Sequence, residues 1–293
     1  MLRLAKPILF GAALMACVAA PASAADFYEP PVVEAPPPVY YQPEPEPAFG
    51  GWYIRGDVDY HLLGFRGGDW ITYGCCGVPD PGTNSFSSGT LRGALSLGAG
   101  AGYQVNKYFR VDLTGDYFFN SAFRGTSEGG CGGVATSCTD ETNFSALVLM
   151  ANAYAELGTW KRITPYVGAG IGGARVNWGD LTNTTAGIPV PSIHAGATSW
   201  RFAWALMAGA SYCINKNWKV DVGYRFMRIN GGRMFELNSP AGVSQGAGPG
   251  FDRGINVHEG RAGLRYQFGG GSDCGPKKEY VSYEPEPIVP VYK

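Results

Sequence analysis

Eight segments of the chain alternate hydrophobic and polar residues with a period of two, which is typical of β-strands with one apolar face. In the segment 52–62, Ile54 and Val58 share one face, and Asp57 and Asp59 lie on the other. The segments that we interpret as strands are 52–62, 91–103, 109–119, 145–157, 165–176, 200–212, 218–227 and 258–268. In the fifth segment the pattern does not show which face is apolar, because that segment is rich in glycine.

The connections between these segments alternate in length. Short turns lie near 106–107, 158–164 and 215–217, and long polar loops lie at 66–88, 120–143, 177–198 and 228–256. A transmembrane β-barrel has this arrangement, with short periplasmic turns and long outward loops. A soluble lipocalin-like barrel does not sort its loops by length. The pattern therefore predicts an all-β protein: an eight-stranded antiparallel transmembrane β-barrel over 51–268, with both termini in the periplasm.

The polar faces of the predicted strands carry most of the charge. Since the apolar face must meet lipid, we expect these charged side chains to point into the barrel. The eight bases and seven acids nearly balance, and buried charges persist only when paired, so they predict a salt-bridge network that fills the lumen. Its predicted members are Arg55, Asp57, Asp59, Arg92, Arg110, Asp112, Asp116, Glu156, Arg201, Lys219, Asp221, Arg225, Glu259, Arg261 and Arg265. Eight strands leave room only for side chains, which argues against a wide porin channel.

Composition agrees with this picture and excludes several classes of protein. Glycine accounts for 44 of the 293 residues, about twice the usual share, and the 16% of charged residues is well below the roughly 25% of soluble domains. The net charge of −1 gives no basic excess for nucleic-acid binding. The 13% of aromatic residues excludes disorder of the whole chain.

The two ends of the chain differ from the middle. Residues 1–24 resemble a secretory signal peptide, with a basic start, a short apolar stretch and a small-residue cleavage site that ends at Ala24. A lipobox that would acylate Cys17 is the alternative interpretation. The segments 25–50 and 269–293 are rich in proline, and we expect both to be disordered periplasmic tails.

The last predicted strand carries a pattern similar to the terminal insertion signal of outer-membrane barrels, formed by Arg261, Gly263, Tyr266 and Phe268. Together with the glycine-rich stretch 164–172 and an Ala-Asp junction after the signal peptide, this pattern makes the chain resemble the eight-stranded outer-membrane proteins of alpha-proteobacteria. These are the porin-like surface antigens of the 25/31-kDa type, distantly similar to the transmembrane domain of outer membrane protein A. In that family the terminal Phe usually ends the chain, whereas here 25 residues follow Phe268.

The resemblance implies a structural, surface-exposed protein of the Gram-negative outer membrane that contributes to envelope integrity and is not an enzyme. A narrow or gated porin-like diffusion channel is the alternative, and a lipid A-modifying barrel enzyme is a further one. The implied partners are outer-membrane lipid, lipopolysaccharide and the barrel assembly machinery, and we expect a monomer without cofactor. In the family, a mature N-terminus that starts Ala-Asp is associated with covalent attachment to peptidoglycan, which makes Ala25 the candidate attachment residue.

The cysteines and histidines add two further expectations. Cys131 and Cys138 lie in one predicted loop, where a disulfide between them would restrain the loop. Two bridges between the first and second loops are the rival connectivity, and the pairing of the other mature cysteines stays open: Cys75, Cys76, Cys213 and Cys274. The three histidines are far apart in sequence, so no metal site is predicted. His61 and His258 would approach each other when the first and last strands pair.

Overall fold

The computed structural model describes residues 50–75, 78–128, 137–185, 190–237 and 246–269 of the chain. These residues form 14 β-strands, and no helix among them is long and apolar enough to cross a membrane. The strands are β1 (Gly51–Phe65), β2 (Gly68–Cys75), β3 (Val78–Leu91), β4 (Ala94–Gln104), β5 (Phe109–Glu128), β6 (Ser137–Glu156), β7 (Ile163–Trp178), β8 (Leu181–Thr185), β9 (Ser192–His194), β10 (Thr198–Cys213), β11 (Trp218–Ile229), β12 (Gly232–Phe235), β13 (Ala247–Asp252) and β14 (Ile255–Gln267). The predicted signal peptide and nearly all of both proline-rich tails lie outside the described residues.

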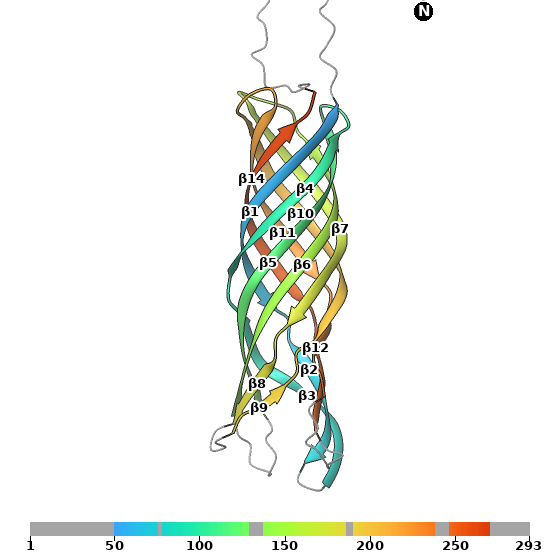
Figure 1. Ribbon diagram of the computed structural model, residues 1–293, viewed down its shortest axis with the longest axis vertical. Coiled ribbons are helices and arrows are strands. Elements are labelled where there is room, and N and C mark those ends of the chain that lie inside the picture. The colour runs from blue at the N-terminus through green and yellow to red at the C-terminus, as the bar shows by residue number, and fades with distance from the viewer. Residues whose placement is uncertain (1–49, 76–77, 129–136, 186–189, 238–245, 270–293) are drawn as a thin grey trace, which may run out of the picture. The chain divides into compact units, whose positions relative to one another are not determined.

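Eight of the strands close into an antiparallel barrel (Figure 1). Their order around the ring is β1, β4, β5, β6, β7, β10, β11 and β14. The first and last strands complete the ring, with Tyr53 opposite Gln267 and Phe65 opposite Ile255. Closure gives every strand of the ring two neighbours, which is the condition for a sheet to cross lipid. The predicted all-β antiparallel barrel is confirmed.

Six further strands lie wholly or mostly in stretches that the sequence predicts as polar loops. At one end of the barrel, β3 pairs with β5, and β2, β13 and β12 follow β3 in the same sheet. On another side, β8 pairs with β6, and β9 pairs with β8. In addition, β5 continues to Glu128 and β6 starts at Ser137. The expectation of loops is wrong here, because beyond the membrane the outward positions of a strand meet water and the apolar alternation disappears. Asn120 and Arg124, for example, are outward-facing residues of β5.

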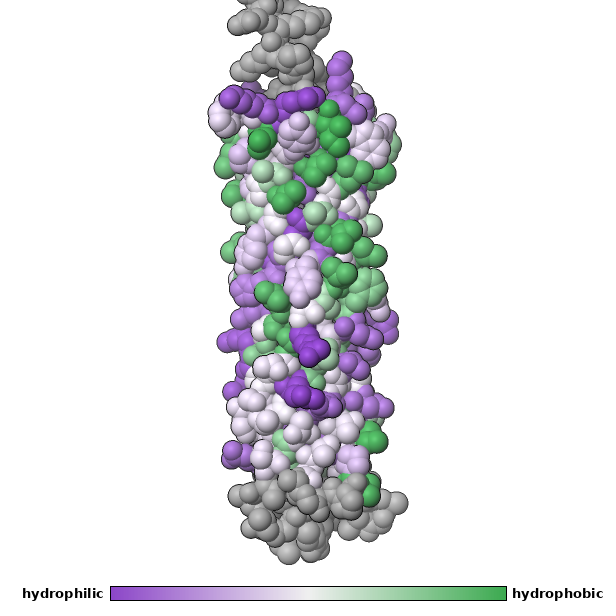
Figure 2. All heavy atoms as spheres, turned by 90° about the vertical axis from the view of Figure 1, so that its left-hand side faces the viewer, coloured by the Kyte–Doolittle hydropathy of each residue, from purple (hydrophilic) through white to green (hydrophobic). Residues whose placement is uncertain are grey.

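The outer surface of the barrel carries an apolar band. On β5 the exposed large hydrophobic side chains extend from Phe109 to Phe119, a length that suits the roughly 9–11 residues of a tilted transmembrane strand. Figure 2 shows one face of the barrel, where apolar side chains gather over the half nearer the short turns and polar ones are frequent over the other half. The band therefore lies toward the short-turn end.

The barrel interior has two layers of different chemistry. Toward the short turns it is charged, and toward the long connections it is a continuous apolar core. This second layer, which we call the apolar layer, includes Phe118, Phe123, Phe144, Val148, Met150, Val176, Trp178, Met227, Ile229, Ile255 and Val257. A salt-bridge network therefore fills only part of the lumen, and side-chain packing fills the rest.

The prediction that Arg92 faces the lumen is wrong. The prediction put it on the polar face of a strand over 91–103, but β4 begins at Ala94 and Arg92 is exposed. Leu91, predicted to face lipid, is instead buried at the end of β3. The break between the two strands shifts the alternation by one residue, and such a shift exchanges the two faces.

Candidate functional site

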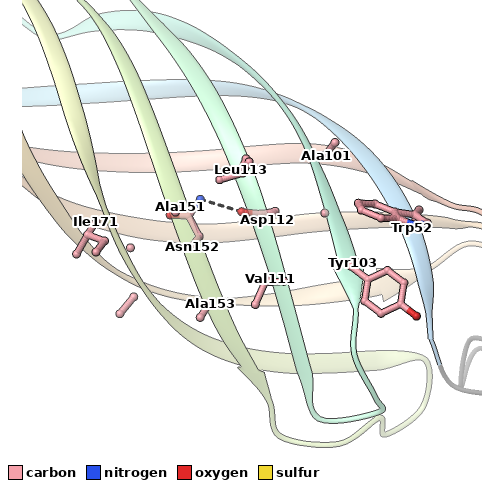
Figure 3. Close-up of a pocket in the computed structure, with 13 residues that line it drawn as sticks. Trp52, Ala101, Tyr103, Val111, Asp112, Leu113, Ala151, Asn152, Ala153 and Ile171 are labelled. Atoms are coloured by element: carbon pink, nitrogen blue, oxygen red, sulfur yellow. Dashed lines mark hydrogen bonds between the residues drawn. The ribbon is translucent and has the colours of Figure 1, made fainter.

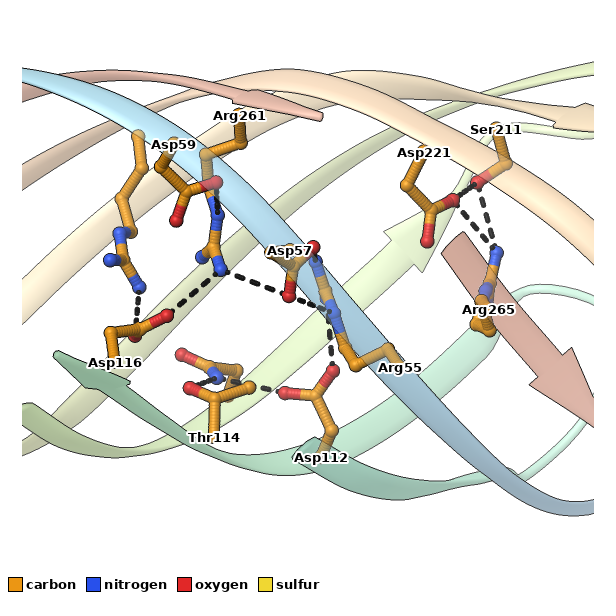
Figure 4. Close-up of polar contacts among 12 residues, drawn as sticks. Arg55, Asp57, Asp59, Asp112, Thr114, Asp116, Ser211, Asp221, Arg261 and Arg265 are labelled. Carbon is orange, nitrogen blue, oxygen red and sulfur yellow. Dashed lines mark hydrogen bonds and ion pairs between the residues drawn. The ribbon is translucent and has the colours of Figure 1, made fainter. Parts of the chain in front are cut away.

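The charged residues of the barrel interior form the site to which the sequence points (Figure 4). Strand alternation turns their side chains inward, and all but one of the fifteen predicted residues are buried. These are Arg55, Asp57, Asp59, Arg110, Asp112, Asp116, Glu156, Arg201, Lys219, Asp221, Arg225, Glu259, Arg261 and Arg265. We refer to all of them except Arg201 as the ionic layer.

Arg225 is the centre of the first group of ion pairs. Its Nη1 donates to Oδ2 of Asp116 at 2.7 Å, and its Nη2 donates to Oε1 of Glu259 at 2.9 Å. Asp116 is shared, since its Oδ1 also accepts a hydrogen bond of 3.2 Å from Nη2 of Arg261. All four side chains are buried, so each charge is compensated by a partner rather than by water.

A second group joins β1 to its neighbours. Arg55 donates from Nη2 to Oδ1 of Asp57 at 2.6 Å and from Nη1 to Oδ2 of Asp112 at 3.2 Å. Arg261 connects this group to the first, because its guanidinium lies 3.3 Å from both Asp57 Oδ2 and Asp59 Oδ1. These contacts cross the β1–β14 pairing, so the network includes the position where the barrel closes.

The third group lies around Glu156. Arg110 Nε lies 3.1 Å and Arg265 Nη1 lies 3.5 Å from Glu156 Oε1. Arg110 also places its guanidinium carbon 3.7 Å from the ring centroid of Tyr154, a cation–π geometry. Arg265 donates from Nη2 to Asp221 Oδ1 at 3.2 Å, so this group joins strands on opposite sides of the barrel.

Arg201 lies apart from the ionic layer, at the other end of the barrel. Its Nη1 donates to Oδ2 of Asp252 at 2.6 Å, and Trp178 Nε1 donates to the same oxygen at 3.1 Å. Asp252 belongs to β13 and was missed by the sequence analysis, because it falls in a stretch assigned to a long loop. Burial raises the pKa of the Asp252 carboxyl, and Arg201 opposes that rise.

Glycines of the inner face make room for the large polar side chains. A Cβ added to Gly98 would overlap the Asp116 carboxylate, and one added to Gly263 would overlap the Asp57 carboxylate. A Cβ at Gly102 would overlap the Tyr53 ring. Alternate glycines at 98, 100 and 102 of β4, and at 168, 170 and 172 of β7, allow close packing in the same way.

The histidines lie in three different environments. His61 is fully buried, with Nδ1 3.3 Å from Ser96 Oγ and Nε2 3.5 Å from Ser121 Oγ. His258 is next to it in the β1–β14 register but points outward, where its Nδ1 lies 2.6 Å from the phenolic Oη of Tyr224. Pairing of the first and last strands therefore brings the two backbones together while their side chains face opposite sides. Among the described residues, no group of three His, Cys, Asp or Glu has an arrangement for a metal ion.

The remaining predicted site residues are only partly described. Cys138 is buried, with Sγ 3.2 Å from Thr185 Oγ1, whereas Cys131 and the candidate attachment residue Ala25 lie outside the described residues. Within the predicted insertion signal, Arg261 belongs to the ionic layer and Gly263 faces Asp57. The last two members, Tyr266 and Phe268, form an aromatic pair with centroids 5.0 Å apart.

Comparison with known proteins agrees with this architecture. Residues 10–268 match the family described as outer membrane protein beta-barrel domain. The chain belongs to this family. A protein of Brucella abortus described as uncharacterized is 39% identical over 271 residues, which cover 84% of this chain and 93% of the relative. Outer membrane protein PagN of Salmonella typhimurium is 26% identical over 199 residues, or 63% of this chain and 76% of PagN.

Solved structures of outer-membrane proteins are among those that the chain matches. The crystal structure of Neisserial surface protein A matches with a TM-score of 0.41 and 16% sequence identity, and the match covers 74% of this chain and 97% of that one. Membership of the family places the chain in the outer membrane of a Gram-negative bacterium.

Proposed function

We propose that this member of the barrel family is a closed, structural outer-membrane protein that contributes to envelope integrity and presents its long connections at the cell surface. The observation that carries the proposal is the ion pair between Arg225 and Asp116, whose strands lie opposite each other in the ring. A side-chain bridge across the lumen occupies the route that a solute would take. The apolar layer supports the same conclusion, because ions do not enter a packed apolar region without losing hydration.

The buried His61–Ser96 pair bears on the alternative of an enzyme. A nucleophilic serine needs a base within hydrogen-bond distance and access for the substrate. Ser96 has the first, at 3.3 Å from His61 Nδ1, but both side chains have 0% exposure. This burial supports a structural role for the pair, and the proposal assigns no reaction to the protein.

Conductance in planar lipid bilayers tests the closed barrel against the alternative of a narrow or gated channel. We expect the purified, folded full-length protein to give no more ion current than protein-free membranes in moderate salt. Insertion is verified independently by heat-modifiable migration of the same preparation on a gel. Stepwise, reproducible openings of the folded protein would contradict the proposal and favour the channel.

We further propose that the N-terminal segment tethers the outer membrane to the cell wall through Ala25. The Ala25-Asp26 sequence after the expected cleavage site supports this proposal, as does the length of the proline-rich segment 25–50. An extended segment of that length reaches on the order of 75 Å at about 3.1 Å per residue, a distance that suits a tether. A passive spacer is the alternative for the same segment.

Purified peptidoglycan decides between tether and spacer. Sacculi are boiled in detergent, digested with lysozyme and analysed by mass spectrometry for peptides that begin at Ala25. A muropeptide bound to an Ala25-Asp26 peptide supports the tether. Complete release of the protein by detergent alone contradicts it, and leaves the closed-barrel proposal unaffected.

A further inference from the structure

A groove lies on the lipid-facing surface of the barrel, close to the short-turn end (Figure 3). It has a volume of about 540 Å³ and an almost entirely apolar lining. It extends from Trp52 on β1 across β4, β5 and β6 to Ile171 on β7. Since neighbouring strands lie about 4.8 Å apart, the groove crosses on the order of 19 Å of barrel surface.

Small residues between larger ones produce the groove. In one row of paired positions, Leu113 of β5 is opposite Ala151 of β6, which is opposite Ile171 of β7. In the adjacent row, Ala153 is opposite Ala169. The small side chains form the floor, and Leu113 on β5 and Ile171 on β7 rise on either side of Ala151. The groove is apolar and crosses several strands, which suits contact with a hydrocarbon chain.

The turns that close this part of the barrel are basic. Lys107 lies in the β4–β5 turn, and Lys161 and Arg162 lie in the β6–β7 turn, so these turns join four of the five strands that line the groove. All three residues are exposed. Neither turn sequence, Val105–Tyr108 or Leu157–Arg162, contains an acidic residue.

The backbone and its aromatic neighbours hold these basic side chains at the barrel end. Lys161 and Arg162 both have positive φ, 46° and 71°, a conformation that is uncommon for residues other than glycine. The Lys107 Nζ lies 5.0 Å from the ring centroid of Tyr108, and the Lys161 Nζ lies 5.1 Å from that of Trp160. Aromatic rings beside basic groups are typical of the lipid headgroup region.

We propose that the groove and the two turns form a binding site for one anionic phospholipid of the periplasmic leaflet. One acyl chain lies in the groove between Leu113 and Ile171. The phosphate of the headgroup lies at the barrel end, where Lys107 and Lys161 neutralise its charge. Short turns face the periplasm in outer-membrane barrels, which selects the phospholipid leaflet and its acidic lipids as the source of the ligand.

Charge favours a lipid over a second copy of the chain in the groove. Two barrels that pack through this face would bring the basic turns of both copies together, and the sequences of these two turns hold no acidic residue that could pair with them. An anionic headgroup instead supplies the missing negative charge. The basic side chains therefore identify the class of occupant, and the apolar groove alone would not.

Native mass spectrometry of the full-length, delipidated protein in detergent micelles tests the site. The probes are palmitoyl-oleoyl phosphatidylglycerol and the phosphatidylcholine with the same acyl chains. We expect the anionic lipid to bind at least about tenfold more tightly. Lys107→Gln and Lys161→Gln are each expected to weaken phosphatidylglycerol binding about fivefold and to leave phosphatidylcholine binding unchanged. Ala151→Leu, which fills the groove, is expected to weaken the binding of both lipids.

Matched variants away from the groove serve as controls. Lys216→Gln changes a basic residue in the β10–β11 turn, and Ala262→Leu enlarges an outward alanine of β14; both are expected to bind phosphatidylglycerol like the parent. Equal affinity of the two lipids would overturn the proposal, as would a loss in Lys216→Gln as large as that in Lys107→Gln. Lipid-free dimers that Ala151→Leu abolishes would also overturn it and assign the groove to a second copy. The lysine variants change only exposed side chains, so their folding is verified by heat-modifiable migration.

Discussion

Arg225 of β11 reaches across the barrel to Asp116 of β5, and the two residues form a 2.7 Å ion pair between strands that are four positions apart in the eight-stranded ring. Four positions is the largest separation that the ring allows, so this pair spans the lumen. The two residues are 109 positions apart in the sequence. Neither side chain is exposed, and the stability of each charge therefore depends on the other.

Replacement of Arg225 tests this dependence. We expect Arg225→Ala to lower the free energy of unfolding by about 3–5 kcal/mol, because Asp116 and Glu259 lose a shared buried partner. The control is Arg124→Ala, which removes an exposed pair with Glu141 and is expected to cost at most about 1 kcal/mol. Urea unfolding in lipid vesicles, followed by tryptophan fluorescence, measures both. Equal midpoints for Arg225→Ala and the parent would contradict the ionic layer as a source of stability.

Glycine at position 172 is expected to be required for packing in β7. A Cβ there would lie far closer to the Leu149 backbone carbonyl oxygen than van der Waals contact allows, and that carbonyl cannot move without disturbing the β6–β7 ladder. Gly172→Ala should therefore destabilise the barrel by about 1–3 kcal/mol or more. Gly260→Ala is the matched control on β14, where an added Cβ meets nothing within 4 Å. Urea midpoints that shift equally in the two variants would argue against the steric explanation.

The two interior layers predict how conductance responds to mutation. Arg225→Ala shortens a side chain in the ionic layer, and Met227→Ala shortens one in the apolar layer two residues along the same strand. Because the layers act in series, we expect each single variant to remain closed and the double variant to pass more current than either. Planar bilayer recordings at equal protein content make the comparison. Current through Arg225→Ala equal to that of the double variant would mean that the apolar layer is no barrier.

His194 predicts a pH response of the extension formed by β8 and β9. Its ring is buried and packs against Phe235, with centroids 5.1 Å apart, and burial lowers the pKa of the imidazole from its usual 6.5. The folded extension thus favours the neutral ring. Its stabilisation is present above pH 6.5 and is lost as the pH falls through the lowered pKa.

Limited proteolysis within 181–194 measures this response. We expect cleavage to increase at acid pH in the parent and to change much less in His194→Phe, which keeps an aromatic ring and cannot be charged. An acid-induced increase of the same size in His194→Phe would assign the effect to another group.

The sequence predicts the membrane-spanning part of this fold well. In that part, the requirement that apolar side chains contact lipid determines which residues of a strand face outward and which face the lumen. On β5, apolar side chains must meet lipid, so Arg110, Asp112 and Asp116 must point inward, and they do. The partner of each charge is less predictable. The Arg225 side chain is long enough to contact acidic residues on several strands. The tilt and stagger of the strands determine that its partners are Asp116 and Glu259.

The apolar layer and the strand extensions are harder to predict for a different reason. Over 144–150 both faces of β6 are mostly hydrophobic, since Leu147 and Leu149 face outward while Val148 and Met150 face the interior. Alternation then carries no information about the contents of the lumen. Beyond the membrane the outward face becomes polar, so the apolar lipid-facing alternation that marks a spanning strand is lost and an extended strand is hard to tell from a loop. Asp252 was missed for that reason.

Arg261 contacts Asp57 and Asp59 across the pairing of the first and last strands, and this placement has a consequence for the order of assembly. The acids belong to the earliest strand of the barrel and the base to the latest, so an open intermediate that contains β1 without β14 holds two carboxylates that lack this cation. Transfer of such an intermediate from water into lipid would therefore be less favourable in free energy than transfer of the closed barrel, because the two carboxylates would lose water without gaining this partner. We therefore expect insertion to be cooperative, with the final strand completing charge neutralisation and closure in a single step.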